Sequence, residues 1–329
     1  MRRNLAKRAA TIVGAATLAA GSASCAAGGS PDKPADDGKL KIVSSTSIWG
    51  DLAHDVAGDK NAEVVSILKN KSDDPHEYEA TARDLAELQD ADLVVANGGG
   101  YDSWLTDAVR PGTPVVTAVP PAEGHDHGSH DHSDHGEDDH GDDSHGDGGH
   151  DHHGHAHGDS NPHVWFDMHI VSHFADNVAS ELHKLNPSID DKPTAVDDKT
   201  HSLDERIHKL PAASVISTES IAQALVDNSG LKDITPNGFK SAVAKEAEPA
   251  AADVEATRKL INDGQAKILI TNEQSQTPAA EQLIQAAKDK GISIINVNET
   301  PEGDQDYFAY VDAFLKDLEK ATGDGSDSH

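Results

Sequence analysis

From residue 39 onward the chain alternates between short β-branched runs and longer segments in which apolar residues recur every three or four positions. The runs predict strands at KLKIVSST, AEVVSILKN, ADLVVANGG, TPVVTAV, ASVISTES, AKILITNE and ISIINVNE. The longer segments predict helices at IWGDLAHDVAG, ATARDLAELQDA, YDSWLTDAV, FDMHIVSHFADNVASELHKLN, 190–210, 220–229, 250–263, 278–290 and 304–322. Strands that alternate with helices favour parallel sheets, so we expect an α/β fold of two βα lobes joined by a long helix. Ligands of such sheets bind beyond the carboxyl ends of the strands, which places a site in the cleft between the lobes.

The composition divides the chain into segments of different character. We expect the following order: signal peptide 1–25, tether 26–38, N-terminal lobe 39–165 with a His-rich loop at 120–160, connecting helices 166–210, C-terminal lobe 211–323 and a disordered tail 324–329.

The first 25 residues have the composition of an export signal. MRRNLAKR is basic, AATIVGAATLAA is a short apolar stretch, and small residues lead to Cys25, the only cysteine. The apolar stretch is too short to span a bilayer. The position of Cys25 resembles a bacterial lipoprotein processing site, which predicts a lipid anchor there and a location outside the cytoplasm, in the periplasm or on the cell surface. The alternative is a plain secretory signal cleaved near Ala23 or Ala27.

The charge of the chain restricts its partners. The formal net charge is −31, and removal of the four basic residues of the signal gives −31 − 4 = −35. Nucleic acid needs Lys and Arg against its phosphates, so we expect no nucleic-acid partner. So acidic a surface suits a protein that meets cations.

Four polar side chains follow predicted strands from both lobes. His76 and His163 lie after two strands of the first lobe, and Glu219 and Glu299 follow two strands of the second. Two imidazoles and two carboxylates can hold a divalent metal; imidazole favours zinc, and carboxylate also suits manganese. Each residue also has an ordinary interpretation: the histidines as solvated loop residues, Glu219 as a cap of helix 220–229, and Glu299 as part of a turn.

The order of four motifs resembles a known family. DPHEYEATARDLAELQDADLVVANGGGYDSWL, NPHVWFD, STESIAQAL and NVNETPEG follow one another as in the metal-binding lipoproteins of bacterial zinc/manganese ABC importers, with a His-rich insertion before NPHVW. The resemblance covers about residues 40–320. It implies a monomer that captures a divalent metal outside the cytoplasm and delivers it to an ABC permease and its ATPase.

The resemblance also implies a ligand set. His76 and His163 would be the ligands of the first lobe, and Glu219 and Glu299 those of the second. Zinc-binding members often carry His where this chain has Glu219, whereas manganese-binding members often carry Glu. Whether Glu299 or a neighbouring acid, Glu302 or Asp304, supplies the last oxygen stays open.

The insertion at 124–158 contains twelve histidines and ten acidic residues in 35 positions. Glycine makes such a segment too flexible for one fixed geometry, so we expect it to gather metal ions weakly for the fixed site or to sense metal supply. Its imidazoles prefer zinc to manganese, which makes Zn²⁺ the expected cargo and Mn²⁺ or Fe²⁺ the alternative. The accessory ligands would be His125, His127, His130, His132, His135, His140, His145, His150, His152, His153, His155 and His157.

Other functions have weaker support. HEYE at 76–79 lacks the second histidine of HExxH, no nucleophile elbow or phosphate-binding loop occurs, and four protein ligands would fill a catalytic zinc site, so we expect no enzyme. An adhesin, or a buffer that hands metal to other proteins, stays open as an alternative.

Overall fold

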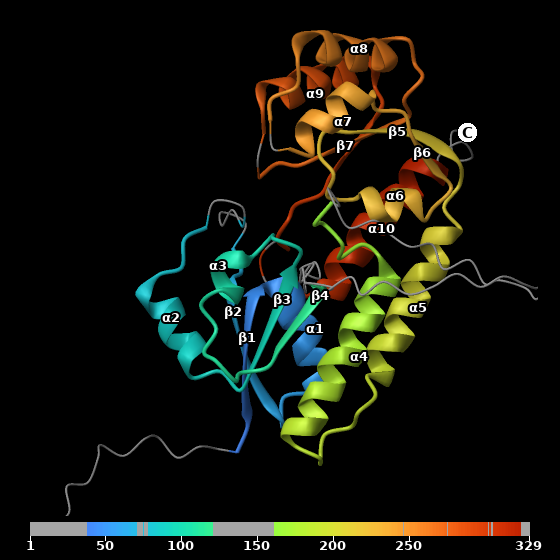
Figure 1. Ribbon diagram of the computed structural model, residues 1–329. Coiled ribbons are helices and arrows are strands. Elements are labelled where there is room, and N and C mark those ends of the chain that lie inside the picture. Colours follow the sequence, from blue (N-terminus) through green and yellow to red (C-terminus); the bar gives the residue numbers. More distant parts are fainter. Residues whose placement is uncertain are drawn as a thin grey trace, which may run out of the picture. The chain divides into compact units, whose positions relative to one another are not determined.

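The computed structural model describes residues 38–70, 75, 78–120, 161–245, 247–274, 276–301, 303 and 305–323. These residues belong to a single structural unit. Within it, Figure 1 shows two sheets, β1–β4 and β5–β8, each flanked by helices. The predicted α/β class with two parallel sheets is therefore confirmed.

The first sheet has the strand order β2-β1-β3-β4, and all its pairings are parallel. All six residues of β3 are buried because it lies inside the sheet. The elements of this half are β1 (Leu40–Thr46), α1 (Ser47–Ala57), β2 (Ala62–Leu68), α2 (Ala82–Gln89), β3 (Leu93–Gly98), α3 (Ser103–Thr106) and β4 (Val115–Val119).

Two helices lead from the first sheet to the second. Asp167 precedes α4 (Met168–Leu185) and accepts the backbone N–H groups of His169 and Ile170, so the acidic residue caps the helix. Pro193 directly precedes α5 (Thr194–His208), where its missing N–H costs nothing. One apolar stripe of α4, which includes Val171, is buried, while the opposite face is polar.

The second sheet repeats the first, with the strand order β6-β5-β7-β8 and parallel pairing throughout. Its elements are β5 (Ala213–Ser217), α6 (Gln223–Asp227), β6 (Leu231–Asp233), α7 (Asn237–Val243), α8 (Ala251–Asn262), β7 (Ile268–Thr271), α9 (Pro278–Lys290), β8 (Ser293–Asn296) and α10 (Tyr307–Gly323). The predicted helix 220–229 is wrong in its extent, because α6 covers only its middle, and the patterns did not indicate β6 or α7.

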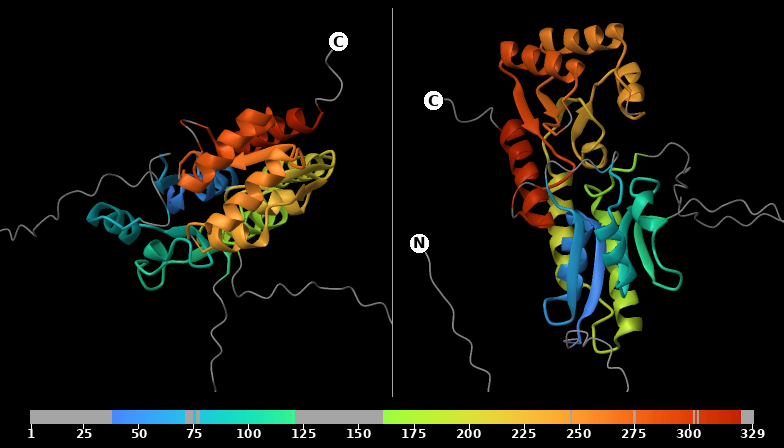
Figure 2. Two further views of the ribbon diagram at one scale, coloured as in Figure 1. Left: turned by 90° about the horizontal axis from the view of Figure 1, so that it is seen from above. Right: turned by 90° about the vertical axis from the view of Figure 1, so that its left-hand side faces the viewer.

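The last helix connects the two halves. α10 contacts β8 of the second sheet, and it also contacts α1 and α5, beside which it lies in Figure 2. Arg206 of α5 donates to Asp312 and Glu319 of α10, at 2.6 Å and 2.9 Å. One cluster of buried apolar side chains includes Ile42 from the first sheet and Val215 from the second. The two halves therefore share a continuous hydrophobic core.

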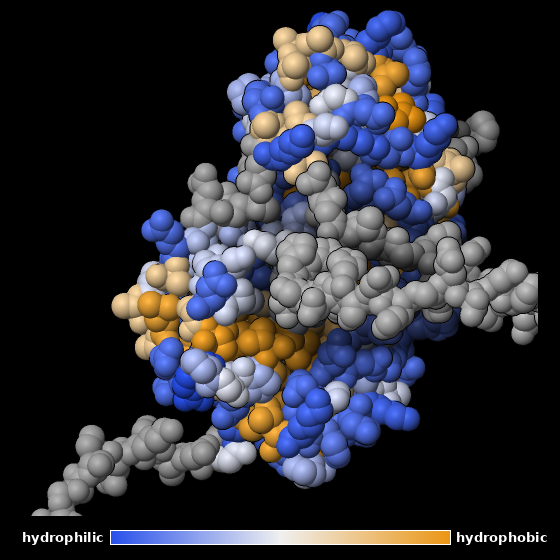
Figure 3. Space-filling view, in the orientation of Figure 1, coloured by the Kyte–Doolittle hydropathy of each residue, from blue (hydrophilic) through white to orange (hydrophobic). Residues whose placement is uncertain are grey.

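The surface of the described residues is mostly polar. Figure 3 shows a hydrophobic band over the first sheet, on the side where α2 and β4 lie. Among the described residues, Leu85, Val115 and Leu185 are large apolar residues that are 40%, 40% and 39% exposed. In the part of the chain that the structure describes, every helix is too short or too polar to cross a bilayer.

Candidate metal centre

His163 is held in place by the buried residues that follow it. Trp165 and Phe166 are each 1% exposed, and the carbonyl of Trp165 accepts a hydrogen bond from the hydroxyl of Tyr307 in α10, at 2.6 Å. The ring of His163 packs edge-on against that of Trp165, with centroids 5.2 Å apart. These contacts fix the segment before α4 and leave the imidazole of His163 only 9% exposed.

Asn161 and Ser220 set the orientation of this imidazole. Asn161 donates through Nδ2 to the carbonyl of Ser220 at 2.7 Å, so its Oδ1 is the atom that faces His163 Nδ1, also at 2.7 Å. An amide oxygen only accepts, so Nδ1 carries the ring proton in the neutral form and Nε2 carries the lone pair. Ser220 lies in the second half of the chain, so the ring is oriented by both halves.

Glu299 lies opposite that nitrogen, just after β8. Its Oε1 is 3.4 Å from His163 Nε2, and its side chain is also 9% exposed. The side-chain oxygen of Gln274 accepts the backbone N–H groups of Glu299, at 2.6 Å, and of Thr300, at 3.3 Å. Gln274 follows β7, so the neighbouring strand of the second sheet holds the loop that carries Glu299.

The second oxygen of Glu299 is bound from the first half of the chain. Tyr101 donates its hydroxyl proton to Oε2 at 2.7 Å. Tyr101 follows three glycines with positive φ, the first of which, Gly98, ends β3. Asp102 beside it accepts the backbone N–H groups of Asn97 and Gly98, at 2.6 Å and 2.9 Å. Burial raises the pKa of Asp102, while these hydrogen bonds lower it by less. The β3–α3 loop is thereby folded into a fixed turn that points Tyr101 at Glu299.

Glu219 lies between β5 and α6 in the same region. Its Oε2 accepts a hydrogen bond from Asn272 Nδ2 at 2.9 Å, and its neighbour Ser220 contacts His163 Nδ1 at 3.2 Å. The interpretation of Glu219 as a helix cap is wrong, because α6 begins at Gln223 after Ala222 and has no side-chain cap. The residue stays a candidate for the metal centre.

The structure thus brings together two of the four predicted ligands, His163 and Glu299, and places Glu219 one residue from a partner of His163. His76, Glu302, Asp304, the twelve histidines of 124–158 and Cys25 lie outside the described residues. Among those that are described, no three His, Cys, Asp or Glu side chains form a group that could hold a metal. The complete ligand set therefore stays a prediction.

The residues that surround the two ligands were not among the predicted site residues. Tyr101 follows β3, and Asn272 and Gln274 follow β7, whereas the predicted ligands follow other strands. Both β3 and β7 lie inside their sheets, so their carboxyl ends are central, and this signal was present in the sequence. Asn161, two residues before His163, was equally readable in NPHVW.

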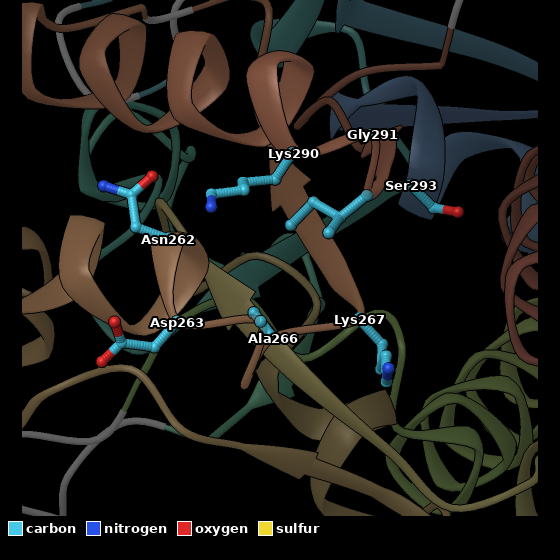
Figure 4. A pocket seen from close by; sticks show the side chains of 9 residues that line it. Asn262, Asp263, Ala266, Lys267, Lys290, Gly291 and Ser293 are labelled. Carbon is cyan, nitrogen blue, oxygen red and sulfur yellow. The ribbon is translucent and has the colours of Figure 1, made fainter.

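A cavity of about 460 Å³ lies elsewhere in the second half. It is lined by residues at the ends of α8 and α9 and at the beginnings of β7 and β8, among them Asp263, Lys267 and Lys290 (Figure 4). The predicted ligands follow the carboxyl ends of strands in this sheet, whereas the cavity is at the amino ends. The cavity is therefore separate from the candidate metal centre.

Comparison with relatives in sequence gives matches over part of the chain. The manganese-binding lipoprotein MntA of Halalkalibacterium halodurans is 38% identical over 76 residues, which are 23% of this chain and 25% of the relative. The manganese ABC transporter substrate-binding lipoprotein PsaA of Streptococcus pneumoniae is 38% identical over 86 residues, 25% of this chain and 27% of the relative. The matched segments thus span about a quarter of these relatives.

Comparison with solved structures covers much more of the chain. The periplasmic zinc-binding protein TroA from Treponema pallidum superposes with a TM-score of 0.63 at 20% identity, over 87% of this chain and 99% of that one. The laminin-binding protein Lmb of Streptococcus agalactiae superposes with a TM-score of 0.60 at 20% identity, over 85% of this chain and 99% of that one. At such identities the likeness shows the fold, which is the two-sheet fold described above.

The family model described as "ZnuA: Zinc-uptake complex component A periplasmic" matches residues 42–321. The match covers both sheets and the residues that surround His163 and Glu299. The family is one of substrate-binding transport proteins, which confirms the expectation that the chain is not an enzyme. The predicted resemblance is confirmed as well: the chain belongs to the ZnuA family of zinc-uptake component A proteins.

Proposed function

We propose that the protein captures a divalent metal, Zn²⁺, outside the cytoplasm and delivers it to an ABC permease. The observation that carries the proposal is the pair formed by His163 Nε2 and Glu299 Oε1, which are 3.4 Å apart and come from the two halves of the chain. Both side chains are nearly buried. A buried carboxylate that faces an imidazole nitrogen is a pair of donor atoms suited to a cation.

The orientation of His163 supports a metal between these two atoms. Because Asn161 engages Nδ1, the neutral ring turns its lone pair towards Glu299, and two electron-rich atoms face each other. Two ligand atoms that lie about 2.0–2.2 Å from a tetrahedral zinc ion are about 3.4 Å apart. The observed separation therefore suits zinc without a large movement of either side chain.

His76 and Glu219 are the further ligands in this proposal. Glu219 is beside Ser220, which contacts the ring of His163. The hydroxyl of Thr300, next to Glu299, donates to the carbonyl of Asn70 at 3.4 Å, so the first half of the chain contacts the Glu299 loop six residues before His76. Two histidines and two carboxylates balance the charge of the ion, which lowers the cost of holding it away from water.

The identity of the metal separates two versions of the proposal. The relatives MntA and PsaA are named for manganese, whereas TroA is named for zinc. The twelve histidines of 124–158 favour zinc, because imidazole binds zinc more strongly than manganese. A site for Mn²⁺ or Fe²⁺ is the alternative.

The remaining parts of the proposal concern the partners. MntA and PsaA are both named as lipoproteins, which supports a lipid anchor on Cys25 and a location outside the cytoplasm. PsaA is also named as a substrate-binding protein of an ABC transporter, which supports a permease with its ATPase as partners. The 124–158 segment would gather metal for the fixed site. Lmb is described as a bifunctional protein with adhesin and metal-transporting activity, so an adhesin role is the second candidate.

Metal analysis of protein that lacks residues 124–158 tests the proposal. We expect this protein to bind one Zn²⁺ tightly in competition with a chelator and to prefer Zn²⁺ to Mn²⁺. His76→Ala and His163→Ala should each abolish the tight binding, whereas His173→Ala, which removes an exposed histidine of α4, should not. Tight binding that survives His163→Ala would reject the proposed site.

A further inference from the structure

We propose that Tyr101 restricts Glu299 to a single metal-binding oxygen and thereby favours zinc over ions of higher coordination number. The inference rests on the proposed function, because it assumes that Glu299 is a ligand. It adds a residue that sets metal specificity without contacting the metal.

The hydrogen bond between the two residues is short and shielded from water. The hydroxyl of Tyr101 is 2.7 Å from Glu299 Oε2, and the two residues are 5% and 7% exposed. A hydrogen bond to a carboxylate is about twice as strong as one between neutral groups. The hydrogen bond from Tyr101 therefore weakens Oε2 as a donor to a metal and holds Glu299 with Oε1 facing His163.

The ring of Tyr101 is fixed by its neighbours. It packs edge-on against the rings of His163 and Trp165, with centroids 5.8 Å and 5.7 Å apart. Its backbone is held by the turn in which Asp102 accepts the N–H groups of Asn97 and Gly98. These contacts hold the hydroxyl of Tyr101 in place, so a rotation of the Glu299 carboxylate away from it would break a buried hydrogen bond.

The number of oxygens that Glu299 offers then selects the metal. Zinc is satisfied by four ligands, and one oxygen from each carboxylate is enough. Manganese favours about six ligands, mostly oxygen, and a carboxylate that binds through both oxygens helps to supply them. By occupying Oε2, Tyr101 withholds a ligand that manganese would use and zinc does not need.

Tyr101→Phe in protein that lacks residues 124–158 tests this role, because the substitution removes the hydroxyl and keeps the ring. The measurement is the ratio of the Zn²⁺ and Mn²⁺ dissociation constants, obtained by competition with chelators. We expect the preference for zinc to fall about tenfold, the scale on which residues that hydrogen-bond a metal ligand act.

Tyr310→Phe is the matched control. The buried Tyr310 donates its hydroxyl to the carbonyl of Asn298, which is next to Glu299, and not to the carboxylate of Glu299. An unchanged ratio in Tyr101→Phe, or an equal fall in Tyr310→Phe, would overturn the inference.

Two further measurements separate this inference from the proposed function. Glu299→Ala should lose tight zinc binding; if it does and the Tyr101→Phe ratio is unchanged, only the role of Tyr101 fails. If Glu299→Ala still binds zinc tightly, the ligand set and the inference both fail. A crystal structure of the zinc-bound protein with Tyr101 intact does not depend on any variant folding. Only Oε1 of Glu299 is expected about 2.0–2.2 Å from the zinc, and both oxygens of Glu299 at that distance would contradict the inference.

Discussion

His163 turns Nε2 towards Glu299 because Asn161, two residues earlier, holds its other ring nitrogen. The Asn161 amide is itself oriented by the carbonyl of Ser220, from the other half of the chain. The NPHVW motif was enough to select His163 as a candidate ligand, but the tautomer depends on a contact that only the folded chain makes. Which ring nitrogen of His163 faces Glu299 therefore depends on a tertiary contact.

Asn161→Ala should weaken zinc binding by about 10–100-fold, because the imidazole loses the partner that fixes its proton on Nδ1. Chelator competition with protein that lacks residues 124–158 measures the effect. Asn186→Ala is the control, since the side-chain oxygen of Asn186 accepts from the N–H and hydroxyl groups of the exposed Ser188, beyond α4. Equal affinities for Asn161→Ala and the unsubstituted protein would show that Asn161 does not orient the ligand.

Among the secondary-structure elements, β3 and β7 carry no predicted ligand, yet residues that follow them hold the site. Tyr101 follows β3, and Asn272 and Gln274 follow β7. The hydrophobic runs predicted both strands, and parallel pairing places the carboxyl end of each beside those of its neighbours in its own sheet. The patterns could not predict the three-residue strand β6 or the short α7, because such elements carry too few apolar positions to show a period. The turn after β3, which aims Tyr101, depends on Gly98.

Gly98→Ala should destabilise the protein by about 2 kcal/mol or more and weaken zinc binding. Gly98 has φ +77°, and a Cβ there would clash with the carbonyl oxygen of Val119 in β4. Gly100→Ala is the matched control: its φ is +90°, but nothing lies within 4 Å of the added Cβ, so only the strain of the backbone remains, about 1 kcal/mol. Urea unfolding measures the free energy of unfolding of both variants. If Gly98→Ala and Gly100→Ala lose the same amount, the clash with Val119 does not add to the loss.

The junction of α1 and α10 should titrate in mild acid. Asp51 of α1 accepts the backbone N–H of Tyr307 at the start of α10, at 3.1 Å, and burial raises its pKa to about 6. The folded chain then holds this proton more tightly than the unfolded chain, so the protonated form contributes stability that is lost as the pH rises from about 4 to about 6.

Asp51→Asn removes this titration and keeps an oxygen that can accept from Tyr307. We expect the variant to gain about 1–3 kcal/mol over the metal-free parent protein between pH 4 and pH 7, with no further gain above. Thermal melts in the presence of a chelator measure the change. Asp191→Asn, at an exposed residue before α5, should follow the parent at every pH. A constant difference between Asp51→Asn and the parent would contradict the raised pKa.

In the molecule as a whole, the two sheets are joined by one continuous core and by the ion pairs of Arg206 with Asp312 and Glu319. Parting the two halves as rigid bodies would divide that core and expose part of it to water. Release of the metal is therefore expected to proceed through movement of loops, on action of the permease, rather than through a hinge. The sequence predicted two lobes and a connecting helical segment, but the contact of α10 with both α1 and β8 depends on packing that no pattern encodes.

This rigidity has a measurable consequence. Small-angle X-ray scattering curves of protein that lacks residues 1–25 and 124–158 should superimpose with and without one equivalent of Zn²⁺, because binding orders loops and leaves the core as it is. A clear compaction on zinc addition would instead indicate a hinge between the two halves.

The position of the bound metal can be measured directly. Crystals of protein that lacks residues 124–158, grown with one equivalent of Zn²⁺, can be measured for anomalous scattering at the zinc edge. We predict one strong peak between His163 and Glu299, about 2.0–2.2 Å from Nε2 of the histidine and from Oε1 of the glutamate. A single peak elsewhere, with His163 and Glu299 still in contact and no metal between them, would contradict the proposed metal centre.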